Sequence, residues 1–359
     1  MNGFDTCRAL PDEQRRFVET FRTLLQIPCP GGREWMMAEK ITSLVGEMGY
    51  QTERDPAGNV LIRLEGSDSD AGPCVFAAHM DEIALVVRDV LDDGTLLVAN
   101  SGGLIPYKLG ERPLQVLGDH ETIVALPNLG HGHGGGQFAS GVSWQDVTIM
   151  TGLSREQLKT AGVRPGTTAV PTPEGRGPLV FGDTARPLLG GWLLDNRAGV
   201  AVQLEVLRSL KEREITPRRP VIFAFTVHEE GGCHGAKSLS FREKPEIFIA
   251  VDGCPITPNC GAIFSAQPAV WSKDRIGHYD QRMVATFLEA GRSVGIECQT
   301  VVQSLAASDA SAAFSTGSVP RAGVIGYPKY CSHGCEIAHL AVFQNTAQTI
   351  LSLLSLQAW

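Results

Sequence analysis

Residues 74–82 read CVFAAHMDE: five apolar residues, then a histidine, a methionine and two acids. A short unbroken apolar run is typical of a strand that is buried on both faces of a sheet. Two further apolar runs, residues 221–227 and 247–251, lead in the same way into Glu229 and Asp252. Open α/β sheets carry their sites beyond the carboxyl ends of the strands. The sequence therefore predicts an α/β fold with a site where these three strands end.

The amino-acid composition and the spacing of apolar residues change between Arg88 and Pro187. Helical spacing of apolar residues is frequent on either side, and we expect helices to sandwich a mixed sheet there. Inside this stretch Gly, Pro and Thr become frequent, and short alternating segments predict a small β-rich domain. We therefore predict a discontinuous catalytic domain, residues 1–88 plus 187–359, interrupted by an inserted domain at residues 89–186.

Composition narrows the class of protein. The 359 residues include 31 Lys and Arg against 39 Asp and Glu, which gives a net charge of −8 and no basic tract. This balance argues against nucleic acid or an anionic membrane surface as a partner. No apolar run approaches the ~20 residues of a membrane span, and the first residues do not resemble a secretory signal. Nine cysteines, an odd number, favour reduced thiols, so we expect a cytoplasmic protein.

Five residues at predicted loop or strand-end positions are candidate metal ligands: His79, Asp195, Glu230, Asp252 and His333. Imidazole and carboxylate ligands without cysteine suit Zn²⁺, Mn²⁺ or Co²⁺. Five ligands are too few for two separate tetrahedral sites, and one bridging carboxylate would remove the shortage. Two metal ions ~3.5–4 Å apart are a known hydrolytic arrangement. The set therefore predicts two divalent ions.

Two acids beside this set suggest roles in proton transfer and orientation. Side chains of neighbouring residues at the end of a strand point in different directions. One of Glu229 and Glu230 would therefore bind metal while the other stays free to move protons. Asp81, two residues after His79, would hold the imidazole ring in the tautomer that binds metal.

Each candidate also has a structural interpretation. His79 alone would fit a hydrogen-bonded core histidine, and the acids at 229 and 230 would suit a helix N-terminus. Asp195 and Asn196 would make a good helix cap, a role that is compatible with metal binding. Asp252, followed by glycine, would also suit a turn.

Other residues that could bind a metal have simpler interpretations. His131 and His133 lie in a Gly-rich segment, which we interpret as a surface loop and not as a third metal site. Cys233, Cys331 and Cys335 are near the proposed site in sequence, but the carboxylate set is complete without them. We interpret these cysteines as small buried residues that are sensitive to oxidation at most.

Four segments, in order along the chain, resemble the metal-site blocks of peptidase family M42 of clan MH. They read AHMDEI (78–83), LDNRAG (194–199), TVHEEGG (226–232) and YCSHGCE (330–336). The segments DPAGNV (55–60) and SDA (308–310) also resemble pieces of that family, and the similarity covers nearly the whole chain. The resemblance implies a zinc-exopeptidase-like catalytic domain with a β-barrel-like insertion. It also implies homo-oligomers, either dimers or the tetrahedral dodecamers of the TET enzymes.

The resemblance also implies a role for each site residue. One metal ion would be bound by His79 and Asp252, the other by Glu230 and His333, with Asp195 bridging them. Glu229 would be the general base and acid, and Asp81 the orienting carboxylate. The implied activity is that of an aminopeptidase, in which a metal-bridging hydroxide attacks the first peptide bond of a substrate with a free N-terminus. The implied cofactors are two divalent ions per subunit, Zn²⁺ or Co²⁺ before Mn²⁺.

The chain departs from the family pattern around the proposed base and in the last ligand block. The family usually has Gln, Val and Arg where this chain has His228, Gly231 and His234. The last block commonly reads Tyr-x-His-Ser, so its imidazole has moved by one place to His333. We keep His333 as the ligand and His339 as the substitute.

Two other functions are compatible with parts of the pattern. Paired carboxylates also catalyse glycoside hydrolysis, at a separation of ~5–9.5 Å and without metal, but the histidines would then have no purpose. A non-catalytic assembly subunit with a degenerate site is the third hypothesis, since residues 228, 231 and 234 depart from the family around the base.

Overall fold

The main body of the protein is a mixed sheet between two layers of helices. The computed structural model describes residues 10–68, 70–130 and 141–356. Eight strands of the described chain form the sheet, in the order β1 (Glu53–Arg54), β2 (Val60–Leu64), β12 (Val221–Thr226), β3 (Cys74–His79), β13 (Ile247–Pro255), β16 (Arg321–Lys329), β14 (Ala269–Lys273) and β15 (Gln299–Val302). The four central strands β12, β3, β13 and β16 run parallel, whereas β2 and β14 are antiparallel to their inner neighbours.

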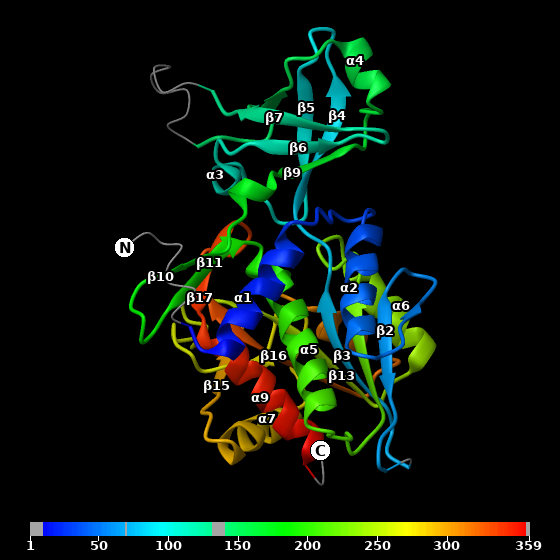
Figure 1. Cartoon of the computed structure of the whole chain (residues 1–359), viewed down its shortest axis with the longest axis vertical. Coiled ribbons are helices and arrows are strands. Elements are labelled where there is room, and N and C mark those ends of the chain that lie inside the picture. The colour runs from blue at the N-terminus through cyan, green and yellow to red at the C-terminus, as the bar shows by residue number, and fades with distance from the viewer. Residues whose placement is uncertain (1–9, 69, 131–140, 357–359) are drawn as a thin grey trace.

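Successive side chains of the central strands point to opposite faces of the sheet, and both faces are apolar. This explains why helices cover both faces. In β3, Phe76 packs into one apolar cluster while Val75 and Ala77 pack into another on the opposite face. The first cluster is covered by α1 (Asp12–Leu25), α2 (Trp35–Glu47), α5 (Leu194–Glu212), α7 (Gln281–Ser293) and α9 (Ala341–Ser355). The second is covered by α6 (His234–Glu243) and α8 (Asp309–Ser315). Figure 1 shows α1, α5 and α9 in front of the sheet. The predicted mixed α/β sandwich is confirmed.

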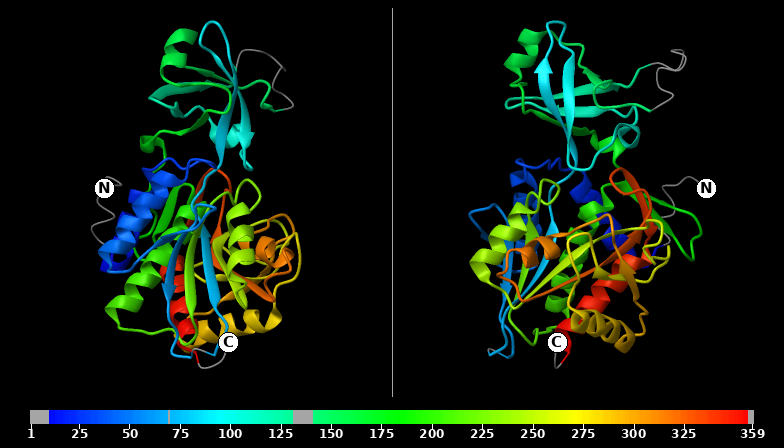
Figure 2. Two further views of the ribbon diagram at one scale, coloured as in Figure 1. Left: turned by 90° about the vertical axis from the view of Figure 1, so that its right-hand side faces the viewer. Right: turned by 180° about the vertical axis from the view of Figure 1, so that it is seen from behind.

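A closed barrel stands on one end of this sandwich (Figures 1 and 2). Its strands follow the order β4 (Ala84–Val90), β5 (Leu96–Ser101), β8 (Thr148–Met150), β7 (Thr122–Asn128), β6 (Leu114–Leu117) and β9 (Thr168–Pro171), and β9 pairs with β4 to close the ring. Two short helices accompany it, α3 (Pro106–Leu109) and α4 (Arg155–Thr160). The β-rich insertion is thus a barrel, while the exact domain limits at residues 88 and 187 stay a prediction.

A smaller sheet lies beside the junction of the two parts. It contains β10 (Leu179–Phe181), β11 (Leu188–Trp192) and β17 (Cys335–His339), preceded by the 3-10 turn η2 (Pro173–Gly175). In its register Gly191 pairs with Glu336 and Trp192 with Cys335. This pairing brings the chain just before α5 next to the segment after β16. No helix among the described residues has the length and apolar character that crossing a membrane needs.

A buried ionic cluster links the barrel to the sheet. The Glu82 carboxylate, at the start of the chain segment that enters the barrel, accepts a hydrogen bond from the Cys29 amide at 2.6 Å. It also accepts from Arg176 at 3.2 Å and from Arg197 at 3.4 Å. All three charged side chains are buried, and Arg176 lies just after η2. One carboxylate from the start of the insertion therefore contacts two buried arginines, Arg176 near the end of the insertion and Arg197 in α5.

Replacing Glu82 with alanine is expected to lower the free energy of unfolding by about 3–5 kcal/mol, because it leaves two buried guanidinium groups without their anion. Urea denaturation of the purified protein measures this change. The matched control is Asp92→Asn, which breaks the exposed Arg155–Asp92 ion pair and is expected to change stability little. An equally small effect at Glu82 would contradict the proposed link.

Candidate metal centre

The three neighbouring parallel strands β12, β3 and β13 are aligned so that the first site residues lie side by side at the same edge of the sheet. His79 closes β3 and pairs with Thr226, the last residue of β12. On the other side of β3, Ala250 pairs with Ala77, which places Asp252 level with His79. One expectation is corrected here: β13 does not stop at Asp252, since it continues to Pro255 beside β16.

Asp195 enters the site from the first turn of α5. Backbone angles at Asp195 and Asn196 are not helical, so the regular helix begins only after them. The Asn196 side chain accepts a hydrogen bond from the Gly199 amide at 3.1 Å and donates one to the Val251 carbonyl at 2.9 Å. Asn196 thus caps the helix and ties it to β13, while the neighbouring Asp195 carboxylate is left free for the site.

His333 reaches the site from the loop between β16 and β17. The loop is closed by backbone pairing of Tyr330 with Ile337, and the His333 amide donates to the Glu336 carboxylate at 3.0 Å. The His333 ring nitrogen Nε2 lies 3.8 Å from Glu230 Oε2. His339 closes β17, and its ring packs against Phe264 with 4.6 Å between the centroids. The structure thus brings His333, and not His339, to the predicted ligand Glu230.

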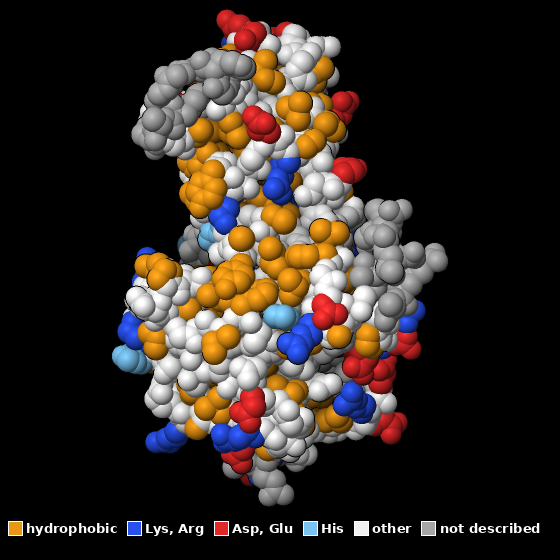
Figure 3. Space-filling view, turned by 90° about the vertical axis from the view of Figure 1, so that its left-hand side faces the viewer, with side chains coloured by type: hydrophobic (Ala, Val, Ile, Leu, Met, Phe, Trp, Pro, Cys, Tyr) orange, Lys and Arg blue, Asp and Glu red, His pale blue; other side chains and the backbone are white. Residues whose placement is uncertain are grey.

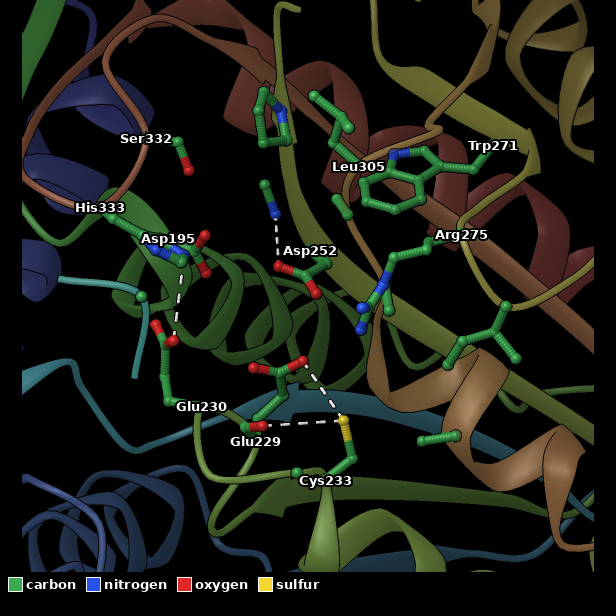
Figure 4. A pocket seen from close by; sticks show the side chains of 18 of the residues that line it. Asp195, Glu229, Glu230, Cys233, Asp252, Trp271, Arg275, Leu305, Ser332 and His333 are labelled. Carbon is green, nitrogen blue, oxygen red and sulfur yellow. Dashed lines mark hydrogen bonds and ion pairs between the residues drawn. The ribbon is translucent and has the colours of Figure 1, made fainter. Parts of the chain in front are cut away.

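The structure brings the five predicted ligands together: Asp195, Glu230, Asp252 and His333 line one cavity, and the buried His79 lies against Asp195. Ligand atoms of His79, Asp195 and Asp252 all lie within 4.8 Å of one another, and His79 Nε2 is 3.0 Å from Asp195 Oδ1. Glu230 and His333 form a second group, joined by the ion pair drawn in Figure 4. The donor set of two imidazoles and three carboxylates therefore fits divalent ions such as Zn²⁺. Whether each residue binds metal stays a proposal.

Asp81 lies behind this set and is buried. Its two carboxylate oxygens accept the amide hydrogens of Glu229 and Glu230 at 2.9 and 3.0 Å, and Oδ1 also lies 3.5 Å from His79 Nδ1. Burial would raise the pKa of Asp81, but His79 and the two amides outweigh burial and lower it. Asp81 therefore fixes the turn that carries the two glutamates and lies beside the imidazole of His79.

The pKa values of the buried carboxyl groups shift in different directions, because burial and mutual repulsion raise them whereas nearby cations lower them. Burial raises the pKa of Glu230 to about 7, and the nearby Asp195 charge adds to the rise. Burial, followed by charges such as Asp195, raises the pKa of Asp252 well above its ordinary value. Asp195 is the exception: burial opposes ionisation, but the Lys329 ammonium outweighs it and lowers the pKa of Asp195. The site therefore carries more negative charge than its own cations balance.

Lys329 is the main positioning residue that the sequence analysis missed. Its fully buried Nζ donates to Asp195 Oδ2 at 2.8 Å and to the Glu336 carboxylate. Glu336 in turn accepts the Asp195 amide at 2.7 Å. A side chain at Gly253 would collide with the Lys329 stem, so this glycine makes room for the lysine. A lysine that closes a long apolar strand was the sequence signal for this role.

The barrel also contributes to the site. Gly102 and Gly103 follow β5, and a Cβ on either would press against the Glu230 or His333 side chain. The site cavity has a volume of about 550 Å³, and Gly103 belongs to its lining. The opposite wall includes Trp271, Arg275 and Leu305 (Figure 4). The cavity is thus built by both parts of the chain.

The residues that depart from the family pattern mostly lie off the cavity wall. The backbone N–H of His228 donates to Glu34 at 3.3 Å and its ring lies 3.6 Å from the same carboxylate, and the rings of His228 and His234 stand edge to face. His228, Gly231 and His234 are all missing from the cavity lining. His131 and His133 lie outside the described residues.

Residues 58–349 match the family model described as M42 glutamyl aminopeptidase. The chain belongs to the M42 family. The M42 glutamyl aminopeptidase of Lactococcus lactis is 27% identical over 248 residues, 67% of each protein. The lysyl aminopeptidase of Pyrococcus furiosus is 27% identical over 243 residues, 65% of each protein.

The fold agrees with this membership. The TET1 peptidase of Pyrococcus horikoshii, which can assemble into a tetrahedron or a large octahedral shell, has a TM-score of 0.82 at 25% identity. That match covers 94% of this chain and 98% of the TET1 chain. The resemblance seen in the sequence is confirmed, and this M42 protein is a metal-dependent aminopeptidase.

Replacing His333 of the M42 enzyme with alanine is expected to weaken the binding of one divalent ion by at least about tenfold, because a ligand is lost. Metal content after gel filtration in metal-free buffer measures this change. His339→Ala is the matched control and should keep the wild-type metal content. The reverse result, with metal lost only in the His339 variant, would make His339 the ligand.

Proposed function

We propose that this aminopeptidase holds two divalent metal ions and removes N-terminal residues from peptides, with Glu229 as the proton-transfer group. His79 and Asp252 would hold one ion, and Glu230 and His333 the other. Asp195 would bridge the two ions. The best substrates are expected to be peptides with a free N-terminus.

One observation carries this proposal: ligand atoms from β3, β13 and the start of α5 lie within 4.8 Å of one another. Such convergence of His79, Asp195 and Asp252 brings buried charge together at a free-energy cost. A bound cation would offset this cost. The central place of Asp195, between His79 at 3.0 Å and the Lys329 ammonium, supports its role as the bridge.

Glu229 has the position that a general base and acid needs. It lines the cavity and is nearly enclosed by protein. Its Oε2 lies 3.9 Å from His79 Nε2, next to the proposed ligands. Burial, followed by charges such as Asp309 and Glu230, raises the pKa of Glu229 well above its ordinary value, although His79 opposes the rise. A carboxylate with a raised pKa takes a proton from water more readily and returns it to the leaving amine.

The remaining residues orient substrate and catalyst. Asp81 holds the backbone of Glu229 in place through the amide hydrogen bond at 2.9 Å. The free α-amine of the substrate requires an acceptor, and the carboxylates of Glu230 and Asp252 line the cavity. When bound, the ions would polarise the peptide carbonyl and lower the pKa of the attacking water. We propose Zn²⁺ or Co²⁺ as the ions, with Mn²⁺ next.

Neither alternative function accounts for this arrangement. Glycoside hydrolysis uses two carboxyl groups without metal and leaves His79 and His333 without a role. A degenerate assembly subunit would have no need to keep five ligand side chains close together at one end of the sheet. Both alternatives predict that removing divalent metal leaves the protein's activity, or lack of it, unchanged.

We also propose that the enzyme is a homo-oligomer, either a dimer or a dodecamer, in the cytoplasm. Large apolar side chains are exposed on and near the barrel, among them Tyr107, Val124 and Leu126. Figure 3 shows hydrophobic side chains gathered over this part of the surface. Such patches are typical of protein–protein contacts. The eight described cysteines are all free, which fits a reducing compartment.

The variant Glu229→Gln is expected to lower kcat on aminoacyl-anilide substrates by about a hundredfold or more, because it removes the proton acceptor. It should keep the two ions of the main centre, since Glu229 is not one of their five proposed ligands. Steady-state kinetics and metal analysis of the same preparation measure both quantities. An unchanged kcat would remove Glu229 from the mechanism.

Chelation provides the control for the reaction class. Removing metal from the wild-type enzyme should abolish the release of N-terminal residues, and adding Co²⁺ or Zn²⁺ should restore it. Hydrolysis of a β-glucan that survives chelation would instead support the glycosidase hypothesis.

A further inference from the structure

A second cluster of possible metal ligands includes Glu229. Glu229, Cys233 and Asp309 each offer one ligand atom, and these atoms all lie within 4.8 Å of one another. Cys233 Sγ is 3.4 Å from Glu229 Oε1 (Figure 4). Cys233 precedes the first turn of α6, and Asp309 is the first residue of α8. The turn between β12 and α6 and the start of α8 therefore bring a thiol and two carboxylates together.

Asp309 has an unused oxygen in this cluster. The side chain is only 2% exposed, and Oδ2 accepts a hydrogen bond from the Thr226 hydroxyl at 2.5 Å. The second oxygen, Oδ1, is buried and has no hydrogen-bond partner. A buried carboxylate oxygen without a donor is costly, and it is uncommon enough in folded proteins to require an explanation. A bound cation would supply the missing partner.

We propose that Glu229, Cys233 and Asp309 form a third divalent-cation site, selective for thiophilic ions such as Zn²⁺, and that an ion bound there inhibits the enzyme. Inhibition rests on the proposed function, because the ion would occupy the carboxylate that Glu229 needs for proton transfer. Binding replaces the thiol proton, which passes to solvent, by a sulfur–metal bond. No oxidant or reductant takes part.

The ligand chemistry separates this site from the main centre. The main centre offers only imidazole and carboxylate groups, whereas Cys233 adds a thiolate, which prefers Zn²⁺ or Cd²⁺ to Mn²⁺. Glu229 and Cys233 both line the cavity, so an ion can reach them from solvent. Three protein ligands would leave a fourth position open to water.

Charges around the thiol favour metal binding over oxidation. Burial, followed by the Glu229 charge, raises the pKa of Cys233 and keeps the thiol protonated, although Lys237 opposes the rise. A protonated thiol reacts slowly with oxidants. A divalent ion would reverse this effect, since the two carboxylates that disfavour a thiolate would then share its counter-ion.

The test uses the full-length enzyme loaded with Mn²⁺ and compares wild type with the variants Cys233→Ala and Cys233→Ser. Cys298→Ser is the matched control, because Cys298 is half-buried beside Thr349 and outside the cavity lining. Added Cd²⁺ is followed by its sulfur-to-metal absorption in the ultraviolet. Added Zn²⁺ is followed by the activity of each protein relative to its own activity before addition.

The wild type and Cys298→Ser should show the absorption band and lose activity as Zn²⁺ rises. In both Cys233 variants the band should disappear, and the Zn²⁺ concentration for half inhibition should rise by at least about tenfold, as expected for loss of a ligand. A band and inhibition that persist in the Cys233 variants would overturn the proposal. The Cd²⁺ absorption measures binding and not activity, so it still tests the third site if the proposed function is wrong. One Cys233 variant is sufficient if the other does not fold.

Discussion

Buried negative charge at the carboxyl edge of the central sheet is the constraint on which the rest of the structure depends. The edge collects the buried or nearly buried acids Asp81, Asp195, Glu229, Glu230, Asp252, Asp309 and Glu336. Burying unpaired charge is costly, so each carboxylate needs donors or cations. Lys329 is fully buried beside two of these acids, and this leaves an excess that two divalent ions would balance.

Local and long-range contacts in the fold stabilise these buried charges. Two backbone amides stabilise the Asp81 carboxylate by donating hydrogen bonds to it. The pairing of β11 with β17 brings Glu336 within 2.7 Å of the Asp195 amide. At the junction with the barrel the excess is positive, and Glu82 is the carboxylate shared by two buried arginines. The segments around Glu82 that link the barrel to the sheet therefore lie close in sequence to site residues such as Asp81 and Asp195.

Much of this could be predicted from the sequence, because the information is local. Apolar runs that end in His79 or lead into Glu229 reveal both the strand and its functional end, and the change of composition after Arg88 reveals the insertion. Lys329 and Glu336 could not be paired with Asp195 from sequence alone, because their contacts depend on a register between strands about 140 residues apart.

Two other features of the site depend on backbone turns that set the direction of a side chain. His228 is adjacent to Glu229 in sequence, but its positive φ of 55° turns it toward Glu34 and away from the cavity. Cys233 was interpreted as a small buried residue, and it is buried, whereas the same interpretation of Cys331 and Cys335 is wrong because both are exposed. The contact of Cys233 with the Glu229 carboxylate follows from the turn between β12 and α6, where Cys233 itself has a φ of 57°. No periodicity in the sequence indicates such turns.

Anomalous diffraction from crystals grown with Zn²⁺ tests the central claim most directly. Apart from any ion beside Cys233, the account predicts two strong peaks on either side of the Asp195 carboxylate, ~3.5–4 Å apart, with His79 beside one peak and His333 beside the other. A single peak, or peaks that Asp195 does not join, would contradict it.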